Sequence, residues 1–420
     1  MAKTPTEHTH YKNNLMNYDL IVIGGGAAGF FGAITCAEQS NKKVLILEKS
    51  SQLLQKVRIS GGGRCNVTHD CQDPRSLSKH YPRGEKSLIG PFNRFQPSDT
   101  IEWFTSRGVE LKTEEDGRMF PTTDSSLTII DTLMNAAESA GVEIRTSSGV
   151  EAILVEDDNH YLVITEDGDT ITTSNILIAT GGTRLAAGAK LAGKLGHSLT
   201  PPVPSLFTFK IQDSRLKDLS GLSVENTTVK IPGTKLASEG PILITHWGMS
   251  GPGILKISAW GARELSDKGY AFQIVVNWSP KIDPNQVISD QRTQAGKRQV
   301  ATYSPFPDIP KRLWQSFLKA ANIPHTTLWS QLSKPQTDKL VYQLTESKFH
   351  VDGKSLNKDE FVTCGGVQLK EINLKTMESK LHKGIYFAGE VMDVDGITGG
   401  FNFQNAWTTG YHAGISVAYC

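Results

Sequence analysis

The predicted ordered part of the chain begins at residue 18 with an apolar pattern that is interrupted by a glycine-rich turn. Tyr18–Ile23 is a short run of mostly apolar, β-branched residues, and it predicts a buried parallel strand. Gly24–Gly29 follows, and the small-residue stretch that continues to about Glu38 predicts a helix. A second apolar run, Lys43–Leu47, predicts the next strand. The pattern therefore predicts a compact βαβ unit at the start of the ordered chain.

Periodicity is weaker over residues 50–120, which are rich in Arg, Gly and Pro, and there we predict one helix at Ser98–Arg107. Apolar residues recur at helical spacing over Ser125–Ala140. From Glu143 to Ala179 short alternating segments are separated by turn-forming Asp, Asn and Gly residues, which predicts a β-meander. The meander is expected to end in a buried strand at Asn175–Ala179.

The proline-rich run Pro201–Pro204 predicts a boundary. Beyond it the chain alternates in strand-like segments, with one predicted helix at Gly253–Leu265. Residues 283–346 then have helical character with proline punctuation. The predicted strands of this region are Leu206–Ile211, Thr227–Ile231, Pro241–Thr245 and Ala271–Asn277.

The last part of the chain returns to the pattern with which it began. Apolar character reappears at Glu360–Thr363, Gly384–Ala388 predicts a strand, and a helix is predicted from about Asn402 to Tyr419. We therefore predict an α/β domain that is interrupted by a β-rich and helical insertion. The predicted limits are a mobile tail over 1–17, the α/β domain over 18–200 and 358–420, the β-rich domain over 201–280 and 347–357, and a helical subdomain over 281–346.

Composition limits the classes of partner. The 420 residues include 44 Lys and Arg against 43 Asp and Glu, a formal net charge of +1, which argues against a nucleic-acid partner. The five cysteines contain no Cys-x-x-Cys pair, so we expect free thiols in a reducing cytoplasm and no metal site. No run approaches the ~20 apolar residues of a membrane span, so no membrane partner is expected. The sequence gives no signal for an oligomeric state.

The glycine-rich turn has the spacing of a dinucleotide-binding motif, Gly24-x-Gly26-x-x-Gly29, in the required strand–helix context. Gly24 permits the tight turn, Gly26 lets the backbone approach a pyrophosphate, and Gly29 allows close helix–strand packing. Glu48 stands at the end of the next strand, where a carboxylate accepts hydrogen bonds from ribose hydroxyls. Because this carboxylate would repel a 2′-phosphate, the site is predicted to bind FAD or NAD rather than NADP.

The C-terminal part of the chain favours FAD over NAD. Phe387-Ala388-Gly389-Glu390 is a strand followed by a glycine and an acid, and Gly399-Gly400-Phe401-Asn402 opens the last predicted helix. Many FAD enzymes end in this order: the acid binds the ribityl chain, and the helix N-terminus points at the flavin O2/N1 edge. The turn Thr180-Gly181-Gly182 after a buried strand is a further feature of flavoproteins.

With these motifs the chain resembles the BaiN-like NAD(P)/FAD-dependent oxidoreductases, the aminoacetone oxidase family of FAD-binding flavoproteins. The resemblance extends from Asp19 over nearly the whole chain, although Phe401 replaces a frequent Tyr and Cys364 a usual small residue. It implies a Rossmann-type FAD-binding domain in discontinuous segments, an inserted β-barrel-like domain and a helical subdomain. The segments that carry it are Arg58–Asn66 (RISGGGRCN), Gly117–Pro121 (GRMFP), Thr245–Pro252 (THWGMSGP), Thr376–Lys380 (TMESK) and Gly389–Asn402.

Candidate site residues follow from the resemblance and from side-chain chemistry. Arg64 is a candidate for stabilising negative charge on flavin or substrate, although a solvated turn arginine explains it equally well. His246 is the candidate acid/base because imidazole titrates near neutrality, and bracing its loop is the alternative. Ser250 is expected to cap the helix that follows. The predicted FAD contacts are Gly24, Gly26, Ala27, Ala28, Gly29, Glu48, Lys49, Arg58, Ser60, Gly61, Gly62, Gly63, Asn66, Val150, Thr180, Gly181, Gly182, Gly389, Glu390, Asp395, Gly399, Gly400, Phe401 and Asn402.

Three hypotheses of function follow. The first is an FAD-dependent oxidoreductase that transfers hydride through flavin N5, as an NAD(P)H-linked reductase of a small or medium, partly apolar substrate such as a conjugated enone. The second is a flavin amine oxidase that uses O₂. The third, of another class, is a non-catalytic flavin-binding sensor or an RNA-associated flavoprotein. Because no second G-x-G-x-x-G motif is present, NAD(P)H is expected only as a transient hydride donor.

Overall fold

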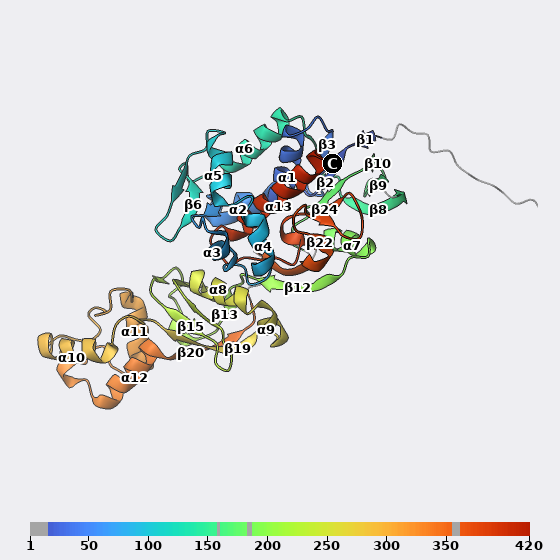
Figure 1. Ribbon diagram of the computed structural model, residues 1–420. Helices are drawn as coiled ribbons and strands as arrows, with labels where there is room; N and C mark the ends of the chain where they lie inside the picture. Colours follow the sequence, from blue (N-terminus) through green and yellow to red (C-terminus); the bar gives the residue numbers. More distant parts are fainter. Residues whose placement is uncertain (1–15, 158–159, 183–186, 355–361) are drawn as a thin grey trace, which may run out of the picture.

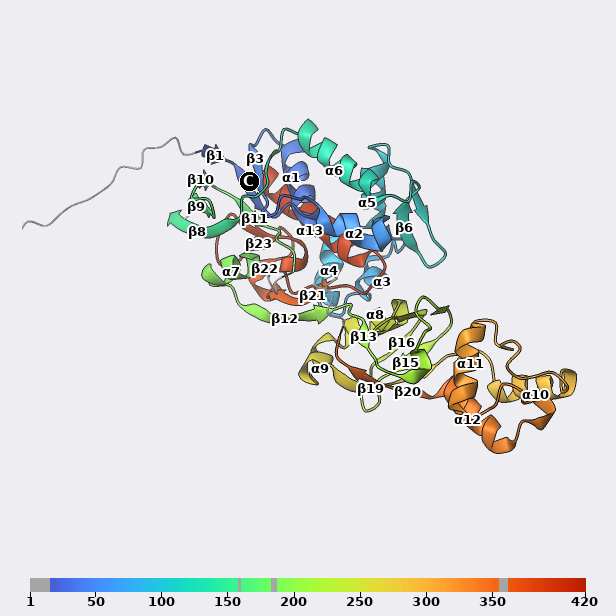
Figure 2. The same cartoon turned by 180° about the vertical axis from the view of Figure 1, so that it is seen from behind.

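The structure is a computed structural model that describes residues 16–157, 160–182, 187–354 and 362–420 (Figure 1). Its buried apolar side chains form two clusters. The larger draws on residues 20–206 and 362–417 together with Ala259, and the second lies within residues 207–351. Figures 1 and 2 show a second body attached to one side of the larger one. The predicted domain limits stay a prediction, and those at 357 and 358 fall outside the described residues.

The larger body is built on a seven-stranded sheet with the strand order β22-β23-β24-β11-β2-β3-β7. The strands from β24 to β7 are parallel, and β23 and β22 add an antiparallel edge. The central strands are buried, which confirms the strands predicted from continuous apolar runs. The strands are β2 (Leu20–Ile23), β3 (Val44–Leu47), β7 (Glu143–Arg145), β11 (Ile176–Ile178), β22 (Ile372–Asn373), β23 (Glu378–Ser379) and β24 (Ile385–Phe387).

Two smaller sheets and a set of helices complete the larger body. The sheets have the strand orders β1-β10-β9-β8 and β4-β6-β5. Their strands are β1 (Met16–Tyr18), β4 (Thr68–His69), β5 (Leu111–Thr113), β6 (Arg118–Pro121), β8 (Val150–Asp157), β9 (His160–Thr165) and β10 (Thr170–Thr173). The helices are α1 (Ala27–Glu38), α2 (Gln55–Gly63), α3 (Pro74–Ser78), α4 (Glu85–Phe92), α5 (Pro97–Thr105), α6 (Ser126–Ser139), α7 (Ala187–Lys194) and α13 (Phe401–Ala418).

Helices α1 and α13 lie side by side and run in the same direction. A Cβ atom at Gly410 would lie 2.6 Å from Ala28 O, and one at Gly414 would lie 2.5 Å from Gly32 O, so only glycine permits this approach. Gly410 stands ten residues after the N-cap of α13, whereas Ala28 stands two residues after the N-cap of α1. At ~1.5 Å per residue, the two helix N-termini are therefore offset by about 12 Å.

The proline-rich boundary lies inside a strand. β12 (Leu199–Ser205) pairs with β21 (Val362–Val367) in a two-stranded antiparallel ribbon that joins the two bodies. Its register shifts between Thr200 and Val203, where two of the prolines stand. Because β12 has only one partner and is irregular at this point, the missing proline N–H groups interrupt no second ladder.

The second body contains two four-stranded antiparallel sheets, β13-β18-β17-β14 and β16-β15-β19-β20. The strands predicted near 227–231, 241–245 and 271–277 are confirmed as β15, β17 and β19. The predicted helix over 253–265 is broken at Gly261 into α8 and α9. The elements are β13 (Phe209–Lys210), β14 (Ser223–Val224), β15 (Thr228–Lys230), β16 (Ala237–Glu239), β17 (Ile242–Thr245), β18 (Gly248–Ser250), α8 (Pro252–Trp260), α9 (Ala262–Asp267), β19 (Ala271–Asn277) and β20 (Ser347–Asp352).

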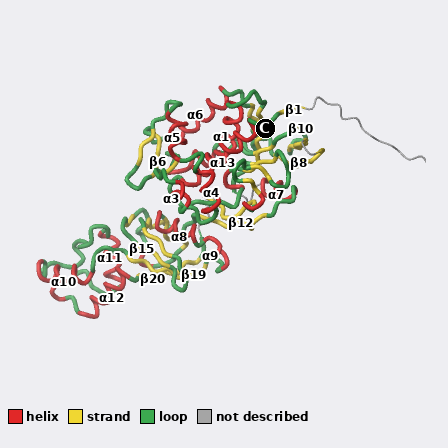
Figure 3. Tube along the Cα trace, viewed as in Figure 1, coloured by secondary structure: helices red, strands yellow, loops and turns green. Residues whose placement is uncertain are grey.

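The predicted helical region is confirmed at the far end of the second body (Figure 3). Its helices are α10 (Pro284–Gln294), α11 (Lys311–Ala320) and α12 (Lys334–Thr345).

Three expectations differ from the structure. The predicted tail includes Met16 and Asn17, which pair with β10 as part of β1, while residues 1–15 lie outside the described residues. The weakly periodic region forms α2, α3 and α4 in addition to α5, and these helices are too short to show a clear period. Ser250 ends β18, because the hairpin strand continues to this residue, and the N-cap of α8 is Gly251.

Gly410→Ala is expected to destabilise the protein, because its Cβ atom meets the backbone of α1 and forces the two helices apart. The expected loss in the free energy of unfolding is about 1–3 kcal/mol, the range for overpacking. Gly193→Ala in α7 is the matched control, since its Cβ atom would make an ordinary 3.7 Å contact with Leu199. Denaturant unfolding measures both variants, and wild-type stability of Gly410→Ala would contradict the packing argument.

Candidate functional site

The glycine-rich turn between β2 and α1 has crowded backbone at one end and open space at the other. Gly24 has φ +114°, and a Cβ atom there would lie 2.5 Å from Ala179 O. A Cβ atom at Gly26, the N-cap of α1, would meet nothing within 4 Å. The N–H groups of Ala27 and Ala28 in the first turn meet no protein acceptor in the described chain. This turn therefore has the properties of an anion site at a helix N-terminus.

Glu48 stands directly after β3, and its carboxylate closes the turn. Oε2 accepts a hydrogen bond from Gly25 N–H at 2.7 Å, and Oε1 accepts one from Ser50 N–H at 2.8 Å. These bonds hold the carboxylate beside the N-terminus of α1. Each oxygen keeps a further lone pair, so the carboxylate can also accept from ribose hydroxyls. That role stays a prediction.

The glycine-rich segment Ser60–Gly63 is the kinked end of α2. Its backbone leaves the helical region at Ser60, and Gly61–Gly63 have positive φ values between 58° and 88°. Cβ atoms at Gly62 and Gly63 would meet nothing within 4 Å, so this backbone faces open space. In the amide orientation that satisfies its neighbours, Asn66 accepts from Gly400 N–H at 2.9 Å. That bond ties the segment to the N-cap of α13.

The loop that leads into α13 is held by side chains on both sides. Asn402 accepts from Gly396 N–H at 2.8 Å and donates to Gly396 O at 2.9 Å. Tyr81 OH donates to Phe401 O at 2.6 Å. The N-cap Gly400 has φ 91°, and no side chain forms a capping hydrogen bond at the positive end of the α13 dipole. Gly399 precedes it, also with positive φ.

The turn after β11 abuts the acid that follows β24. Glu390 accepts from Thr363 N–H at 2.7 Å and pairs with Lys56 Nζ at 2.5 Å. A Cβ atom at Gly182 would lie 2.8 Å from Glu390 Oε1, which shows that the two segments touch. The hydroxyl of Thr180 is buried without a hydrogen-bond partner in the described protein. A bound ligand is one way in which such a group is satisfied.

Three other predicted FAD contacts lie in different settings. Lys49 is exposed and pairs with Glu166 at 2.5 Å. Arg58 is exposed on α2, and Val150 is buried at the start of β8. Direct contact of these residues with FAD stays a prediction, as it does for Gly181 and Gly389, which have positive φ in the turns already described.

Asp395 is fully buried and joins the larger body to the insertion. Its carboxylate pairs with the Arg83 guanidinium and accepts from Ser205 Oγ at 2.6 Å. Arg83 Nη1 also donates to Ala259 O at the end of α8, at 2.6 Å. Burial raises the pKa of Asp395, although the Arg83 charge acts in the opposite direction. The carboxylate therefore has protein partners of its own, and its predicted contact with FAD stays a prediction.

Arg64, one of the two predicted catalytic residues, is engaged at the surface of the larger body. Its Nη1 pairs with Glu114 at 2.7 Å, and its guanidinium lies 3.9 Å from the centroid of the Phe120 ring. The hydrogen bond with Glu114 raises the pKa of Arg64. A catalytic role for Arg64 stays a prediction.

His246, the other predicted catalytic residue, is exposed in the turn between β17 and β18. The carbonyl oxygen of the neighbouring Trp247 accepts a hydrogen bond from Ile211 N–H at 2.9 Å. Ile211 lies six residues after Ser205, the residue that bonds Asp395. A catalytic role for His246 stays a prediction.

Two imidazoles that sequence reasoning missed lie at the N-terminus of α13. The Phe401 ring stacks on His69 at 4.6 Å and on His80 at 4.3 Å, with interplanar angles of 20° and 17°. His69 Nε2 donates to Asp116 O at 3.1 Å, so Nδ1 is an acceptor, and it is buried without a partner in the described chain. Burial lowers the pKa of His69 and, together with neighbouring charges, lowers that of His80 to about 4.

Helix α8 of the insertion faces these imidazoles. Lys256 stands three residues before Ala259, so its side chain shares a face of α8 with that of Ala259, which packs in the apolar cluster of the larger body. Its positive charge lowers the pKa of both His69 and His80. The two imidazoles thus lie at the α13 N-terminus, within range of the charge of a lysine from the other body.

This arrangement fits FAD. The open N-terminus of α1 suits the pyrophosphate, Glu48 suits the adenosine ribose, and the N-terminus of α13 suits the flavin edge where negative charge develops. The offset of about 12 Å between the two helix N-termini leaves space for the ribityl chain between them. Open backbone at Gly26, Gly62 and Gly63 lets a ligand approach without meeting side chains.

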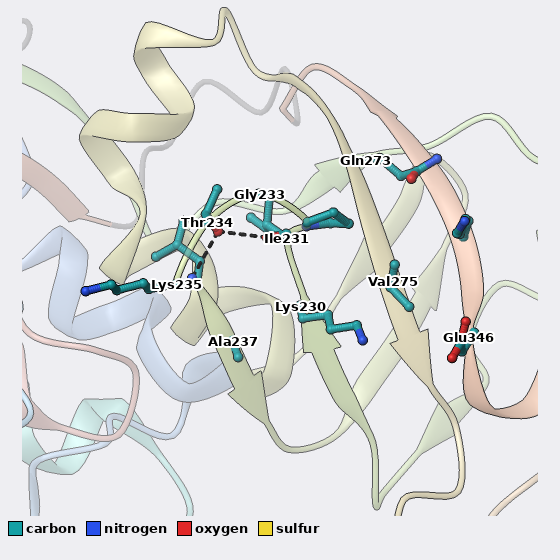
Figure 4. Close-up of a pocket in the computed structure, with 12 residues that line it drawn as sticks. Lys230, Ile231, Gly233, Thr234, Lys235, Ala237, Gln273, Val275 and Glu346 are labelled. Carbon is teal, nitrogen blue, oxygen red and sulfur yellow. Dashed lines mark hydrogen bonds between the residues drawn. The ribbon is translucent and has the colours of Figure 1, made fainter.

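A separate cleft of about 530 Å³ lies on the second body (Figure 4). The turn between β15 and β16 forms one wall, and Gln273, Val275 and Lys348 on β19 and β20 form another. Lys230 and Lys235 also border it. Because the predicted FAD contacts do not line this cleft, it is distinct from the candidate flavin site.

The described residues contain no group of three or more His, Cys, Asp or Glu side chains that could hold a metal ion. None of the helices described is both long and apolar enough to cross a membrane.

Comparison with known proteins gives matches over nearly the whole chain. The family model of the HI0933-like protein Rossmann domain matches residues 18–416. The 3-dehydro-bile acid delta(4,6)-reductase of Clostridium scindens is 29% identical over 408 residues, which cover 94% of this chain and 98% of that protein. The ribosomal RNA dihydrouridine synthase of Escherichia coli is 30% identical over 410 residues, with coverage of 94% and 96%.

Among solved structures, the 3-ketosteroid-delta4-(5alpha)-dehydrogenase of Rhodococcus jostii RHA1 in complex with 4-androstene-3,17-dione is similar. It aligns with a TM-score of 0.51 and 14% identity over 99% of each chain. At this identity the likeness shows a shared fold.

Gly26→Val is expected to weaken FAD binding, because its side chain occupies open space where the pyrophosphate approaches, while an apolar N-cap lowers the stability of the apoprotein by no more than about 1 kcal/mol. Its extended backbone accepts any residue. We expect the Kd for FAD to rise at least about tenfold, a change of ~1.4 kcal/mol. Gly24→Ala is the comparison, since its Cβ atom meets backbone and lowers stability as well. Wild-type affinity of Gly26→Val would contradict this placement of the pyrophosphate; FAD titration and thermal unfolding measure both effects.

Proposed function

Because the chain belongs to the HI0933-like Rossmann-domain family, whose members are FAD-dependent oxidoreductases, we propose that it reduces a carbon–carbon double bond conjugated to a carbonyl group. The observation that carries this proposal is the chemistry shared by the two relatives. By their names, one saturates double bonds of a 3-dehydro-bile acid and the other makes dihydrouridine from uridine. Each reaction adds a hydride and a proton across a double bond made electron-poor by a carbonyl.

The residues that would hold FAD are those around the two helix N-termini. The N–H groups of the first turn of α1 bind the pyrophosphate, and Glu48 accepts from the ribose. Asn66 holds Gly400 in place, so that the dipole of α13 stabilises negative charge at the flavin edge. When bound, FAD supplies a hydride from N5.

The hydride donor and the compartment belong to the same proposal. Since the sequence has a single G-x-G-x-x-G motif, NAD(P)H is proposed to enter transiently at the junction of the two bodies. We place the protein in the cytoplasm, where this donor is available, and its five free cysteines agree with a reducing compartment.

Anaerobic mixing with NADH and NADPH is expected to bleach the flavin, and a conjugated enone such as 2-cyclohexen-1-one is expected to restore its colour. One mole of saturated ketone should form for each mole of NAD(P)H consumed. Absorbance of the flavin and product analysis measure the two half-reactions separately. A flavin that neither nucleotide bleaches would contradict the proposal of an NAD(P)H-linked reductase. Bleaching by amines, with return of the colour only in O₂, would favour an amine oxidase.

The distribution of charge favours RNA as a second candidate substrate. Residues 201–354 contain 19 Lys and Arg against 12 Asp and Glu, a formal charge of +7. The remainder contains 25 against 31, a charge of −6. The near-neutral total therefore averages two regions of opposite sign and does not argue against nucleic acid.

The cleft of Figure 4 lies within the basic region. Lys230, Lys235 and Lys348 border it together with Glu346, and in the described chain no carboxylate lies within 4.0 Å of the three ammonium groups. Lys230 and Lys348 are in register on either side of Val275, so their side chains share one face of the sheet. Free ammonium groups on one exposed face are a suitable contact for phosphates.

Replacing Lys230, Lys235 and Lys348 together by Gln is expected to weaken binding of a uridine-containing RNA hairpin at least about tenfold. The slope of log K against log salt should fall by about 2, since each phosphate contact contributes roughly 0.7–0.9. The matched control replaces three exposed lysines of the acidic remainder, Lys86, Lys190 and Lys370, by Gln. Fluorescence anisotropy at several salt concentrations measures both. Equal affinity of the two triple variants would contradict this surface, and absence of RNA binding by the wild type would remove the RNA candidate.

A further inference from the structure

We propose that His80 and Lys256 bind the carbonyl oxygen of the substrate and stabilise the negative charge that this oxygen gains during hydride transfer. This inference rests on the proposed function and names the part of the site that recognises the electron-withdrawing group. It assigns the two residues from opposite sides of the junction, one from the larger body and one from the insertion.

The position of His80 is fixed by contacts with the entry to α13. Its ring stacks on Phe401 at 4.3 Å, and its backbone O accepts from Ile397 N–H at 2.9 Å. Tyr81, the next residue, donates to Phe401 O at 2.6 Å. Within the described chain neither ring nitrogen of His80 has a hydrogen-bond partner, and neither is a fully buried atom. An imidazole N–H is therefore available at the N-terminus of the helix that suits the flavin edge.

Lys256 stands on the part of the insertion that packs against the larger body close to His80. The bond from Arg83 to Ala259 O fixes the end of α8 against the larger body, and Arg83 is only three residues after His80. Lys256 is half-buried, and no carboxylate of the described chain lies within 4.0 Å of its ammonium group. The ammonium group is therefore available to a ligand that carries negative charge.

The electrostatic setting favours an oxyanion. The groups that act on the pKa of His80 are its own burial, the His69 ring and the Lys256 charge, and all three lower it, with no carboxylate among them. The imidazole is thus neutral at pH 7 and donates its N–H without carrying charge of its own. A neutral imidazole beside a helix N-terminus can polarise a carbonyl in this way. Donors placed where charge develops stabilise the transition state more than the ground state.

The reaction adds one hydride and one proton to the substrate while these donors bind its oxygen. Hydride bonds to the β-carbon, the double-bond electrons shift toward the carbonyl, and the oxygen takes the negative charge of an enolate. His80 and Lys256 hold this oxygen while the α-carbon receives a proton from water. NAD(P)H loses the hydride and leaves as NAD(P)⁺.

Binding of 4-nitrophenol to the FAD-loaded protein tests the anion site without turnover, because its ionised form is planar, resembles an enolate and is coloured. We expect the wild type to lower the apparent pKa of the bound phenol by at least about one unit, which is a tenfold preference for the phenolate. Lys256→Met should abolish this preference. Lys217→Met, an exposed lysine of the same body, is the matched control and should retain it. Equal phenolate preference in Lys256→Met and the control would overturn the proposal.

The two half-reactions give a second, independent readout. In His80→Leu, reduction of the flavin by NAD(P)H should keep its rate, whereas reoxidation by the enone should slow by about 10²-fold, as for loss of an oxyanion donor. His80→Gln, which keeps an N–H donor, should recover most of the rate. A similar loss in both variants would overturn the role of His80. Enone reduction by the wild type with no phenolate preference would reject this inference and leave the proposed function standing.

Discussion

The backbones of α1 and α13 touch because Gly32, Gly410 and Gly414 lack side chains, and the rest of the candidate site depends on this contact. It holds two helix N-termini in the same direction at a fixed offset. A dinucleotide cofactor carries negative charge on its pyrophosphate and develops more at its reducible ring, so two positive helix ends at that separation suit both. A larger residue at the contact changes the spacing, and with it the relative placement of both ends.

The second requirement is that the insertion stays against the larger body. Asp395 is fully buried, and Arg83 links it to the last turn of α8, so a charged pair lies where the two bodies meet. Burial of such a pair contributes little to stability by itself, but it strongly penalises arrangements in which one partner is unpaired. The pair therefore fixes the orientation of α8, and through α8 the position of Lys256.

Local patterns in the sequence predict those elements whose structure depends mainly on nearby residues. The runs Leu20–Ile23 and Val44–Leu47 are buried strands because both faces of a parallel sheet are covered. The strand β12 was not predicted, because proline is unfavourable in most strands. It is tolerated here because β12 belongs to an irregular two-stranded ribbon. His69 and His80 were not predicted as site residues, because the feature that distinguishes them is their stacking on Phe401. That contact forms only when the C-terminal part of the chain has folded against them. His246 was predicted as a catalytic residue from its motif, but a motif does not indicate the direction in which a hairpin turn points.

The order of the strands also has a consequence for how the chain is made. β24 pairs with β11 although about 200 residues separate them, and α13 covers α1 only after the C-terminus is complete. At ~5–20 residues per second, a ribosome needs roughly 10–40 s to bridge that gap. During this interval the second body, with its own apolar cluster, has all of its residues up to 351 available to fold. The newly made first half meanwhile exposes an open sheet edge and a glycine-lined helix face, so this protein is most vulnerable to aggregation while it is still being synthesised.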